Sequence, residues 1–301
     1  MAGTLRAKKG RKMEENKQGR FRVTLLGTGA PPPVLDRFGP STLVEVGEER
    51  FLFDAGRGAL QRLYQLKIRF ADMLFLTHLH SDHVVGIPDL WLTGWVSGRA
   101  GPLRVWGPAG TRDMMSHLEK AFGFDIRVRR GLHPSEGVAV LAEDFTEGLV
   151  YDRNGIKVTA FEVDHGLVKP AFGFRIDYAG RSVILSGDTT FNENLIRHSR
   201  GADLVIHEVI APDLFRAFRA ASSQERVNKV IQNHATPEQA GEVFTRAAPR
   251  LAVYSHIVPP TAAAQDLIPA TRKTYSGPLE VGEDLMAIEV GERIQVHRFK
   301  D

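Results

Sequence analysis

The sequence contains no cysteine, and this absence restricts its chemistry more than any other feature of its composition. Without cysteine the chain has no disulfide bond, no zinc–thiolate site and no cysteine nucleophile. A metal ion bound by this protein must therefore be held by histidine, aspartate or glutamate side chains.

A long apolar segment is also missing. No run of about 18 apolar residues occurs in the chain, so no transmembrane helix is predicted. No apolar segment follows the basic residues near the start, which excludes an ordinary secretory signal peptide. We therefore expect a cytoplasmic protein with no membrane partner.

Positive charge is scarce outside the first residues. The whole chain has a net charge of +3, but residues 1–20 alone carry seven basic and two acidic residues, a net of +5. Residues 21–301 are therefore at −2, close to neutral. We predict a disordered basic tail over residues 1–20 and a single folded domain over 21–301. A near-neutral domain argues against a broad surface for binding nucleic-acid phosphates.

Short β-like segments and longer amphipathic segments alternate along residues 21–301, which predicts one mixed α/β domain. No internal repeat interrupts this pattern. The expected strands are Phe21–Leu26, Thr42–Val46, Arg50–Phe53, Met73–Leu76, Val138–Ala142, Lys157–Val163, Phe172–Tyr178, Ser182–Leu185, Leu204–Ile206 and Leu251–Tyr254. The expected helices are Ala59–Lys67, Pro237–Ala247 and Ala262–Thr274.

Polar residues follow several of these strands directly. His78 follows one predicted strand, Asp188 another and His256 a third. A buried strand holds the loop after it rigidly, so α/β proteins place reactive groups there. We therefore expect these strand ends to converge on one cleft.

The segment His78-Leu79-His80-Ser81-Asp82-His83 concentrates four metal-ligand side chains in six residues. The structural alternative is a solvated histidine-rich loop. Further residues of the same chemical types, His165, Asp188 and His256, favour a metal site instead. The other isolated histidines are expected to have ordinary surface or core positions: His117, His133, His198 and His297.

This pattern resembles the metallo-β-lactamase superfamily, and the resemblance extends over nearly all of residues 21–300. It includes the segments Leu26-Gly27-Thr28-Gly29 and Leu52-Phe53-Asp54-Ala55-Gly56. The resemblance implies a four-layer αββα sandwich, with two mixed sheets flanked by helices. It also implies two divalent metal ions bridged by Asp188, the first held by His78, His80 and His165, and the second by Asp82, His83 and His256.

Neutral imidazole suits zinc or iron, and the added carboxylates make manganese acceptable. We expect zinc, with manganese and iron as alternatives. Two such ions lower the pKa of a shared water from about 15.7 towards about 7, and the resulting hydroxide is the expected nucleophile. Asp82 is the expected catalytic group that orients or deprotonates this water. For Asp54 two roles stay open: a partner of a ligating imidazole, or a cap of the turn before Gly56.

Two further motifs resemble the branch that contains ribonuclease Z, phosphodiesterases and arylsulfatase-like hydrolases. His207-Glu208 matches the first half of the ribonuclease Z motif His-Glu-Ala-Thr, although Val209-Ile210 departs from the second half. His234 precedes the predicted helix Pro237–Ala247, as a histidine does in that branch. The resemblance implies that Glu208 and His234 are catalytic and protonate the leaving oxygen. The structural alternatives are an ion pair of Glu208 with an arginine and a helix-capping role for His234.

Only 23 positions separate His165 from Asp188, which leaves no room for the tRNA-clamping arm that ribonuclease Z commonly carries between these motifs. The segments Gly166–Gly173 and Phe38–Ser41 look closest to the arylsulfatase-like group. Trp91 and Trp95 are interpreted as core residues or as walls of an aromatic pocket with Leu214, Phe215 and Phe218. A basic cluster is interpreted as a solvated strand edge or a phosphate contact: Arg127, Arg129 and Arg130.

We therefore predict a hydrolase that acts on a small phosphodiester or sulfate ester, with RNA not favoured as a substrate. A ribonuclease Z-type endonuclease that acts on tRNA 3′ ends is the first alternative. A lactonase or β-lactamase and a nonenzymatic metal-stabilised binding module are the others. The sequence does not fix the oligomeric state, and a homodimer is compatible with it.

Overall fold

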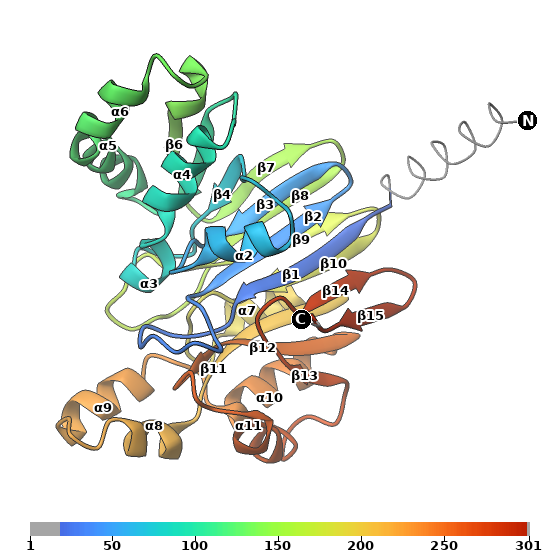
Figure 1. Cartoon of the computed structure of the whole chain (residues 1–301). Helices are drawn as coiled ribbons and strands as arrows, with labels where there is room; N and C mark the ends of the chain where they lie inside the picture. Colours follow the sequence, from blue (N-terminus) through green and yellow to red (C-terminus); the bar gives the residue numbers. More distant parts are fainter. Residues whose placement is uncertain (1–18, 300–301) are drawn as a thin grey trace, which may run out of the picture.

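The computed structural model describes residues 19–299, which form two β-sheets packed face to face with helices on both outer sides (Figure 1). The first sheet has the order β15-β14-β1-β2-β3-β4-β5-β6. Its strands are β1 Phe21–Gly27, β2 Ser41–Val46, β3 Glu49–Phe53, β4 Met73–Phe75, β5 Leu103–Gly107, β6 Val140–Asp144, β14 Ala287–Val290 and β15 Ile294–His297. Along the part of the sheet with the order β15-β14-β1-β2-β3, each strand pairs with its neighbour in antiparallel orientation. From β3 to β6, neighbouring strands pair in parallel.

The second sheet has the order β13-β12-β11-β10-β9-β8-β7 and is also mixed. Strands β10 to β13 run parallel, whereas β7 to β10 are antiparallel. Its strands are β7 Gly148–Arg153, β8 Ile156–Glu162, β9 Phe172–Tyr178, β10 Arg181–Leu185, β11 Leu204–Ile210, β12 Leu251–Val258 and β13 Leu279–Val281.

Central strands are buried on both faces because one face meets the other sheet and the other meets helices. In β2, all six residues are buried. Val44 packs between the sheets with Val23 and Phe174, while its neighbour Leu43 packs under the helices with Trp91. This alternation follows from the period of two in an extended chain.

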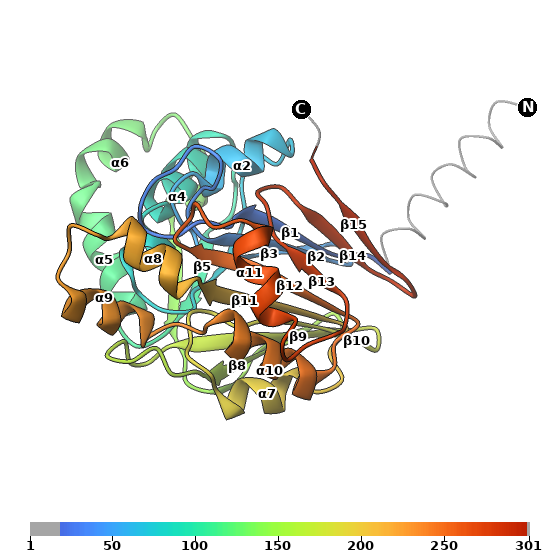
Figure 2. The same ribbon diagram turned by 90° about the horizontal axis from the view of Figure 1, so that it is seen from below.

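Helices α2 Ala59–Gln65 and α4 Ile87–Val96 cover the outer face of the first sheet. Helices α5 Thr111–Ala121 and α6 Gly123–Arg129 pack on the same side of this sheet. Helices α7 Glu193–Ser199, α10 Pro237–Ala247 and α11 Ala264–Thr271 cover the second sheet (Figure 2). The short α3 spans Ser81–Val84, and α8 Pro212–Phe218 and α9 Gln224–Ile231 form a small separate cluster. The predicted four-layer αββα sandwich is therefore confirmed.

Several local predictions need correction. The predicted strand Val138–Ala142 begins only at Val140, because Ser135–Val138 forms a 3₁₀ turn. The helix predicted over Ala262–Thr274 is shorter and spans Ala264–Thr271. The basic cluster is not a strand edge: Arg127 and Arg129 lie in α6, and Arg130 ends it.

Trp91 and Trp95 are core residues rather than walls of a substrate pocket. Both side chains are fully buried. Their indole N–H groups donate to the carbonyl oxygens of Val138 and Pro134, each at 2.8 Å. A buried indole with a satisfied donor is typical of a packed interior.

Most of the predicted tail lies outside the described residues, but Arg20, which we had counted with it, contacts the first sheet. Its guanidinium donates to Glu45 Oε2 at 2.7 Å, and its carbonyl accepts from Gly47 N at 2.8 Å. Within residues 19–299, none of the helices is long and apolar enough to cross a membrane.

Replacing the buried Arg99 with methionine should lower the free energy of unfolding by about 2–4 kcal/mol, because carbonyl groups would lose their donor. Arg99 is fully buried and donates to the carbonyls of Trp91 at 2.8 Å and Gly137 at 2.9 Å. It thereby ties α4 to the 3₁₀ turn. Urea denaturation measures the change, with the exposed Arg153→Met as control. A loss no larger than that of the control would contradict this role.

Candidate metal centre

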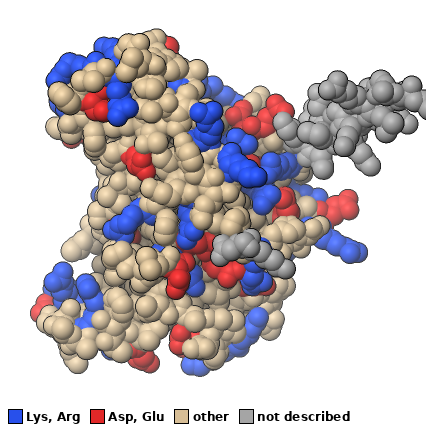
Figure 3. All heavy atoms as spheres, viewed as in Figure 1, with Lys and Arg blue, Asp and Glu red and all other residues tan. Residues whose placement is uncertain are grey.

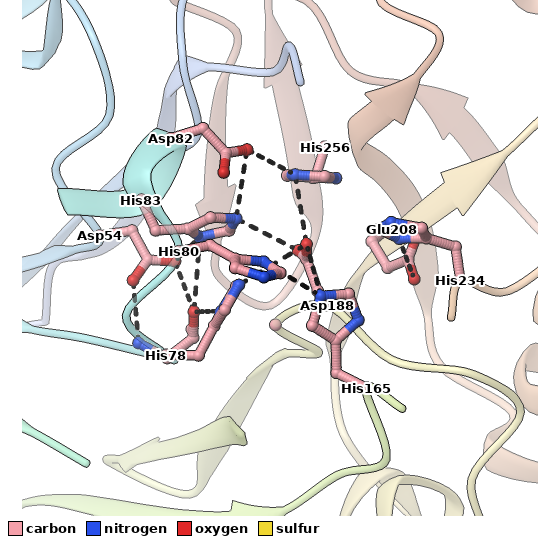
Figure 4. A network of polar contacts seen from close by, with 12 residues as sticks. Asp54, His78, His80, Asp82, His83, His165, Asp188, Glu208, His234 and His256 are labelled. Atoms are coloured by element: carbon pink, nitrogen blue, oxygen red, sulfur yellow. Dashed lines mark hydrogen bonds and ion pairs between the residues drawn. The ribbon is translucent and has the colours of Figure 1, made fainter. Parts of the chain in front are cut away.

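The seven predicted metal-ligand residues lie together in one cluster (Figure 4). His78 follows β4, Asp188 follows β10 and His165 follows β8. Asp82 and His83 lie on α3, whose helical turn brings both side chains to the same place as His78. The expectation that distant strand ends meet is therefore correct for these elements.

Backbone contacts hold the short α3 in position. Ala55 N donates to the His83 carbonyl at 2.7 Å, and Gly86 N donates to the Ala55 carbonyl at 2.8 Å. A side chain at Gly56 would place its Cβ 2.6 Å from the Asp82 carbonyl oxygen. The turn after β3 therefore needs glycine at this position so that α3 can pack against it.

One group of ligand atoms belongs to His78, His80, His165 and Asp188, all within 4.8 Å of one another. Asp188 Oδ2 lies 3.9 Å from His78 Nε2 and 3.7 Å from His165 Nε2. His80 Nδ1 lies 3.3 Å from His165 Nε2. Four side chains from three parts of the chain thus point at one volume.

A second group contains Asp82, His83 and His256. His256 Nε2 lies 3.3 Å from Asp82 Oδ2, and His83 Nε2 lies 3.7 Å from the same oxygen. Asp188 faces this group as well, because its Oδ1 is 3.5 Å from His83 Nε2 and its Oδ2 is 3.4 Å from His256 Nε2. Asp188 therefore lies between the two groups.

His256 reaches the cluster from within a strand, and not from a strand end as we expected. Strand β12 continues to Val258, and its pairing with β11 changes register at this point. Two residues of β12, Ser255 and His256, face the single Glu208 of β11, and His256 has a φ of 43°. A bulge of this kind turns a side chain out of the regular pleat, which here directs the imidazole to the cluster.

The donor set fits divalent metal ions. Among the described residues, buried atoms without a hydrogen-bond partner include His78 Nε2, His83 Nε2 and Asp188 Oδ1. A buried polar atom without a partner costs about 1–3 kcal/mol, so these atoms require another ligand. Imidazole nitrogens and carboxylate oxygens are the donors that zinc and related ions bind.

The buried carboxylates of the cluster are kept ionised by their imidazole neighbours. Burial raises the pKa of Asp188, but the neighbouring His256 and His83 outweigh burial and hold the pKa well below its usual value. Burial likewise raises the pKa of Asp82, and His83 and His256 reverse the shift. Burial lowers the pKa of His78, and the nearby His83 lowers it further. Two ionised carboxylates and a neutral imidazole therefore face the same volume.

Asp54 contacts a predicted ligand instead of only capping the turn before Gly56. Its Oδ2 lies 2.8 Å from His83 Nδ1 and accepts at 2.8 Å from the hydroxyl of Thr77. Its Oδ1 accepts from Thr77 N at 2.9 Å. A carboxylate at Nδ1 fixes the tautomer that leaves Nε2 free to face the cluster.

Replacing Asp54 with asparagine should weaken metal binding about 10–100-fold, the usual effect of losing such a partner. The φ of Asp54 is 58°, a conformation that asparagine adopts readily, so the backbone should be preserved. Competition with a chelator measures the affinity, and Asp152→Asn on the exposed end of β7 is the control. Unchanged affinity would show that Asp54 is only structural.

Glu208 and His234 form a hydrogen-bonded pair beside the cluster. His234 Nδ1 lies 3.1 Å from Glu208 Oε1, which also accepts from the backbone N–H groups of Thr189 and Ala235, each at 3.1 Å. Burial lowers the pKa of His234, but the Glu208 carboxylate outweighs burial and raises the pKa to about 9. The alternative ion pair of Glu208 with an arginine does not occur among residues 19–299, and Thr236 rather than His234 caps α10.

His234 is also close enough to share a metal ion, because its nitrogen groups with ligand atoms of Asp188 and His256 within 4.8 Å. Of the predicted ligand residues, only His80 is exposed. The cluster is therefore open to solvent on the side of His80, where a substrate can approach.

Sequence reasoning missed two contacts of this site. Thr77 links Asp54 to the hub, the segment His78-Leu79-His80-Ser81-Asp82-His83, since its hydroxyl also lies 3.0 Å from His78 Nδ1. The Asn233 carbonyl lies 2.8 Å from His165 Nδ1. A polar residue directly before the hub was a usable signal for Thr77, whereas a backbone carbonyl leaves no trace in the sequence.

The fold and this cluster define a metal-dependent hydrolase. A family model described as the beta-lactamase superfamily domain matches residues 49–257. Proteins named ribonuclease Z are 38% identical over 286 residues in Mycolicibacterium gilvum and 37% identical over 282 residues in Mycobacterium marinum. These matches cover 91% and 90% of this chain and 96% and 99% of the two relatives. The chain therefore belongs to the metallo-β-lactamase superfamily and, within it, to the ribonuclease Z branch.

Solved structures agree on the fold. The short form of human tRNase Z is similar with a TM-score of 0.68 and 22% identity, covering 90% of this chain and 99% of that chain. The metallo-β-lactamase fold protein YhfI from Bacillus subtilis also has a TM-score of 0.68, at 18% identity, with coverage of 90% and 99%.

The predicted small phosphodiester or sulfate ester substrate is wrong, and so is the expectation that RNA is not favoured. These predictions depended on the missing arm between His165 and Asp188, on the near-neutral charge of the domain and on the arylsulfatase-like segments. Relatives named ribonuclease Z match almost from end to end, so they too have little chain beyond the shared domain. A short interval at this point therefore does not separate the chain from ribonuclease Z.

Proposed function

We propose that this protein is a ribonuclease Z-type endonuclease that hydrolyses a phosphodiester bond at the 3′ side of precursor tRNA. The observation that carries the proposal is 38% identity over 91% of the chain to proteins named ribonuclease Z. The paired Glu208 and His234 support it, because expelling a ribose oxygen requires a proton.

In this proposal, His78, His80 and His165 would hold one divalent ion, and Asp82, His83 and His256 would hold the other. Asp188 would contribute to both sites, since its carboxylate lies between both groups of ligand atoms. When bound, the two ions supply an activated water and neutralise charge on the phosphate. We propose zinc, since imidazole dominates the donor set.

Asp82 accepts the proton of the attacking water. Its carboxylate faces the cluster at 3.3 Å from His256 Nε2, and its lowered pKa keeps it ionised. Glu208 holds His234 in place through Nδ1, so that Nε2 can donate a proton to the departing ribose oxygen. A pKa of about 9 keeps His234 protonated at neutral pH.

The zinc- or manganese-loaded protein should cleave a precursor tRNA with a 3′ trailer at much higher kcat/KM than other esters. The comparison substrates are bis-p-nitrophenyl phosphate, p-nitrophenyl sulfate and a homoserine lactone. Denaturing gel electrophoresis locates the cleavage site, and mature tRNA is the control. Preferential hydrolysis of the sulfate or the lactone would refute the proposed function.

A further inference from the structure

Two helical lobes lie on the same side of the sandwich as the candidate metal centre. The α5–α6 lobe comprises residues 108–134, and the α8–α9 lobe comprises residues 212–232. Figures 1 and 2 both show the lobes projecting in the same direction, and in Figure 1 α3, which carries Asp82 and His83, lies between them. The lobes therefore flank the approach to the cluster.

The α8–α9 lobe is joined to the site at both of its ends. The chain enters this lobe just after Glu208 and leaves it just before His234. Ile210 N donates to the Ala235 carbonyl at 2.9 Å, and this hydrogen bond joins the chain just before the lobe to the chain just after it. A molecule held on this lobe is thereby held close to the proposed proton donor.

The α5–α6 lobe also begins against the site. It follows β5, the neighbour of the strand β4 that leads to His78. A Cβ at Gly110 would lie 3.3 Å from Leu79 Cδ1 in the hub. Asp144 Oδ1 accepts from Arg112 N at 2.9 Å, which fixes the start of α5.

Positive charge is concentrated on these two lobes. The α5–α6 lobe has five basic and three acidic residues, and the α8–α9 lobe has four basic and two acidic residues, so each carries +2. The rest of residues 21–301 then carries −6. Figure 3 shows basic side chains on both lobes, at the upper left and the lower left of the view. The domain is close to neutral as a whole, but its two lobes are basic and the remainder is acidic.

Some of these basic groups are engaged by acidic neighbours in the same helix. Arg129 pairs with Asp125 at 2.7 Å, and Lys229 pairs with Glu225 at 2.7 Å. Others form no ion pair with any residue in the described range 19–299: Arg112, Lys120, Arg127 and Arg130 on one lobe and Arg219 and Arg226 on the other. Their charges remain for a partner.

We propose that the α5–α6 and α8–α9 lobes bind the phosphate backbone of the RNA substrate on either side of the metal cluster. This inference rests on the proposed function. A polyanion is attracted to the lobes and repelled by the acidic remainder of the domain, which orients it towards the cluster. The two lobes are small basic surfaces beside the candidate metal centre, and they can bind RNA phosphates although the domain has no broad basic surface.

Two double variants test the lobes separately: Arg127→Gln with Arg130→Gln, and Arg219→Gln with Arg226→Gln. The matched control, Arg153→Gln with Lys157→Gln, removes two exposed charges from β7 and β8. At about 0.15 M salt each lobe variant should raise KM for precursor tRNA roughly tenfold. The slope of log KM against log salt should fall by about 1.4–1.8, the contribution of two phosphate contacts.

The control variant should retain the wild-type KM and slope, and all variants should hydrolyse bis-p-nitrophenyl phosphate at the wild-type kcat. Lobe variants that match the control on precursor tRNA would overturn the inference and leave the proposed function intact. Lobe variants that also lose turnover of the small ester would overturn it too, because the effect would lie in the cluster. Failure of the wild-type protein to cleave precursor tRNA would instead refute the proposed function.

Discussion

Replacing Asp188 with alanine should remove at least one bound metal ion and lower kcat about 1000-fold. The carboxylate faces both groups of ligand atoms, with Oδ1 3.5 Å from His83 Nε2 and Oδ2 3.7 Å from His165 Nε2. A metal pair contributes several kcal/mol to stabilising a phosphoryl transition state, and each 1.36 kcal/mol corresponds to tenfold in rate. Metal analysis after gel filtration and single-turnover cleavage of precursor tRNA measure the two effects.

The exposed Asp152→Ala is the control for this experiment, since it removes the same group far from the cluster. Circular dichroism of the Asp188→Ala protein checks that the sandwich is intact. Retention of two ions together with wild-type turnover would refute the bridging role of Asp188.

Replacing His234 with glutamine should lower kcat on precursor tRNA by about 10²–10⁴-fold, the usual contribution of a general acid. The same variant should lose less than about tenfold on bis-p-nitrophenyl phosphate, because nitrophenolate leaves without a proton. Glu208→Gln should change the two rates in the same direction, since Glu208 holds His234 Nδ1 at 3.1 Å and raises its pKa. Steady-state kinetics on both substrates measures the difference.

His297→Gln, exposed on strand β15 outside both lobes, is the matched control. Metal content must be measured alongside, because His234 also lies within reach of a metal shared with Asp188 and His256. Equal losses on the two substrates, accompanied by loss of an ion, would make His234 a metal ligand and refute its role as proton donor.

The residues that meet in the candidate metal centre could be predicted from the sequence because their signal is local and chemical. The hub His78-Leu79-His80-Ser81-Asp82-His83 places four ligand types in six residues, and buried strands lead into it and into Asp188. The same logic failed in detail for His256, whose strand continues past it. A bulge depends on the register between two strands, and neither strand encodes that register by itself.

The proposed RNA substrate could not be predicted in the same way. The missing arm favoured a small ester, and the near-neutral domain argued against RNA. Net charge is a sum over the chain, whereas an RNA surface depends on where the charges lie. Arg127 and Arg226 are about a hundred positions apart in sequence, yet they lie on two lobes that project from the same side of the molecule.

The sequence by itself determined the donor atoms, the αββα architecture and the exclusion of thiolate chemistry, because residue identity and hydrophobic period set these properties directly. Only the tertiary structure decided which atoms share a volume. It placed Asp188 between the two groups of ligand residues and paired Glu208 with His234. It also put the two basic lobes on the same side of the molecule as the candidate metal centre. Contacts of this kind join residues that folding alone brings together, and their energies depend on distances and burial that the order of residues does not specify.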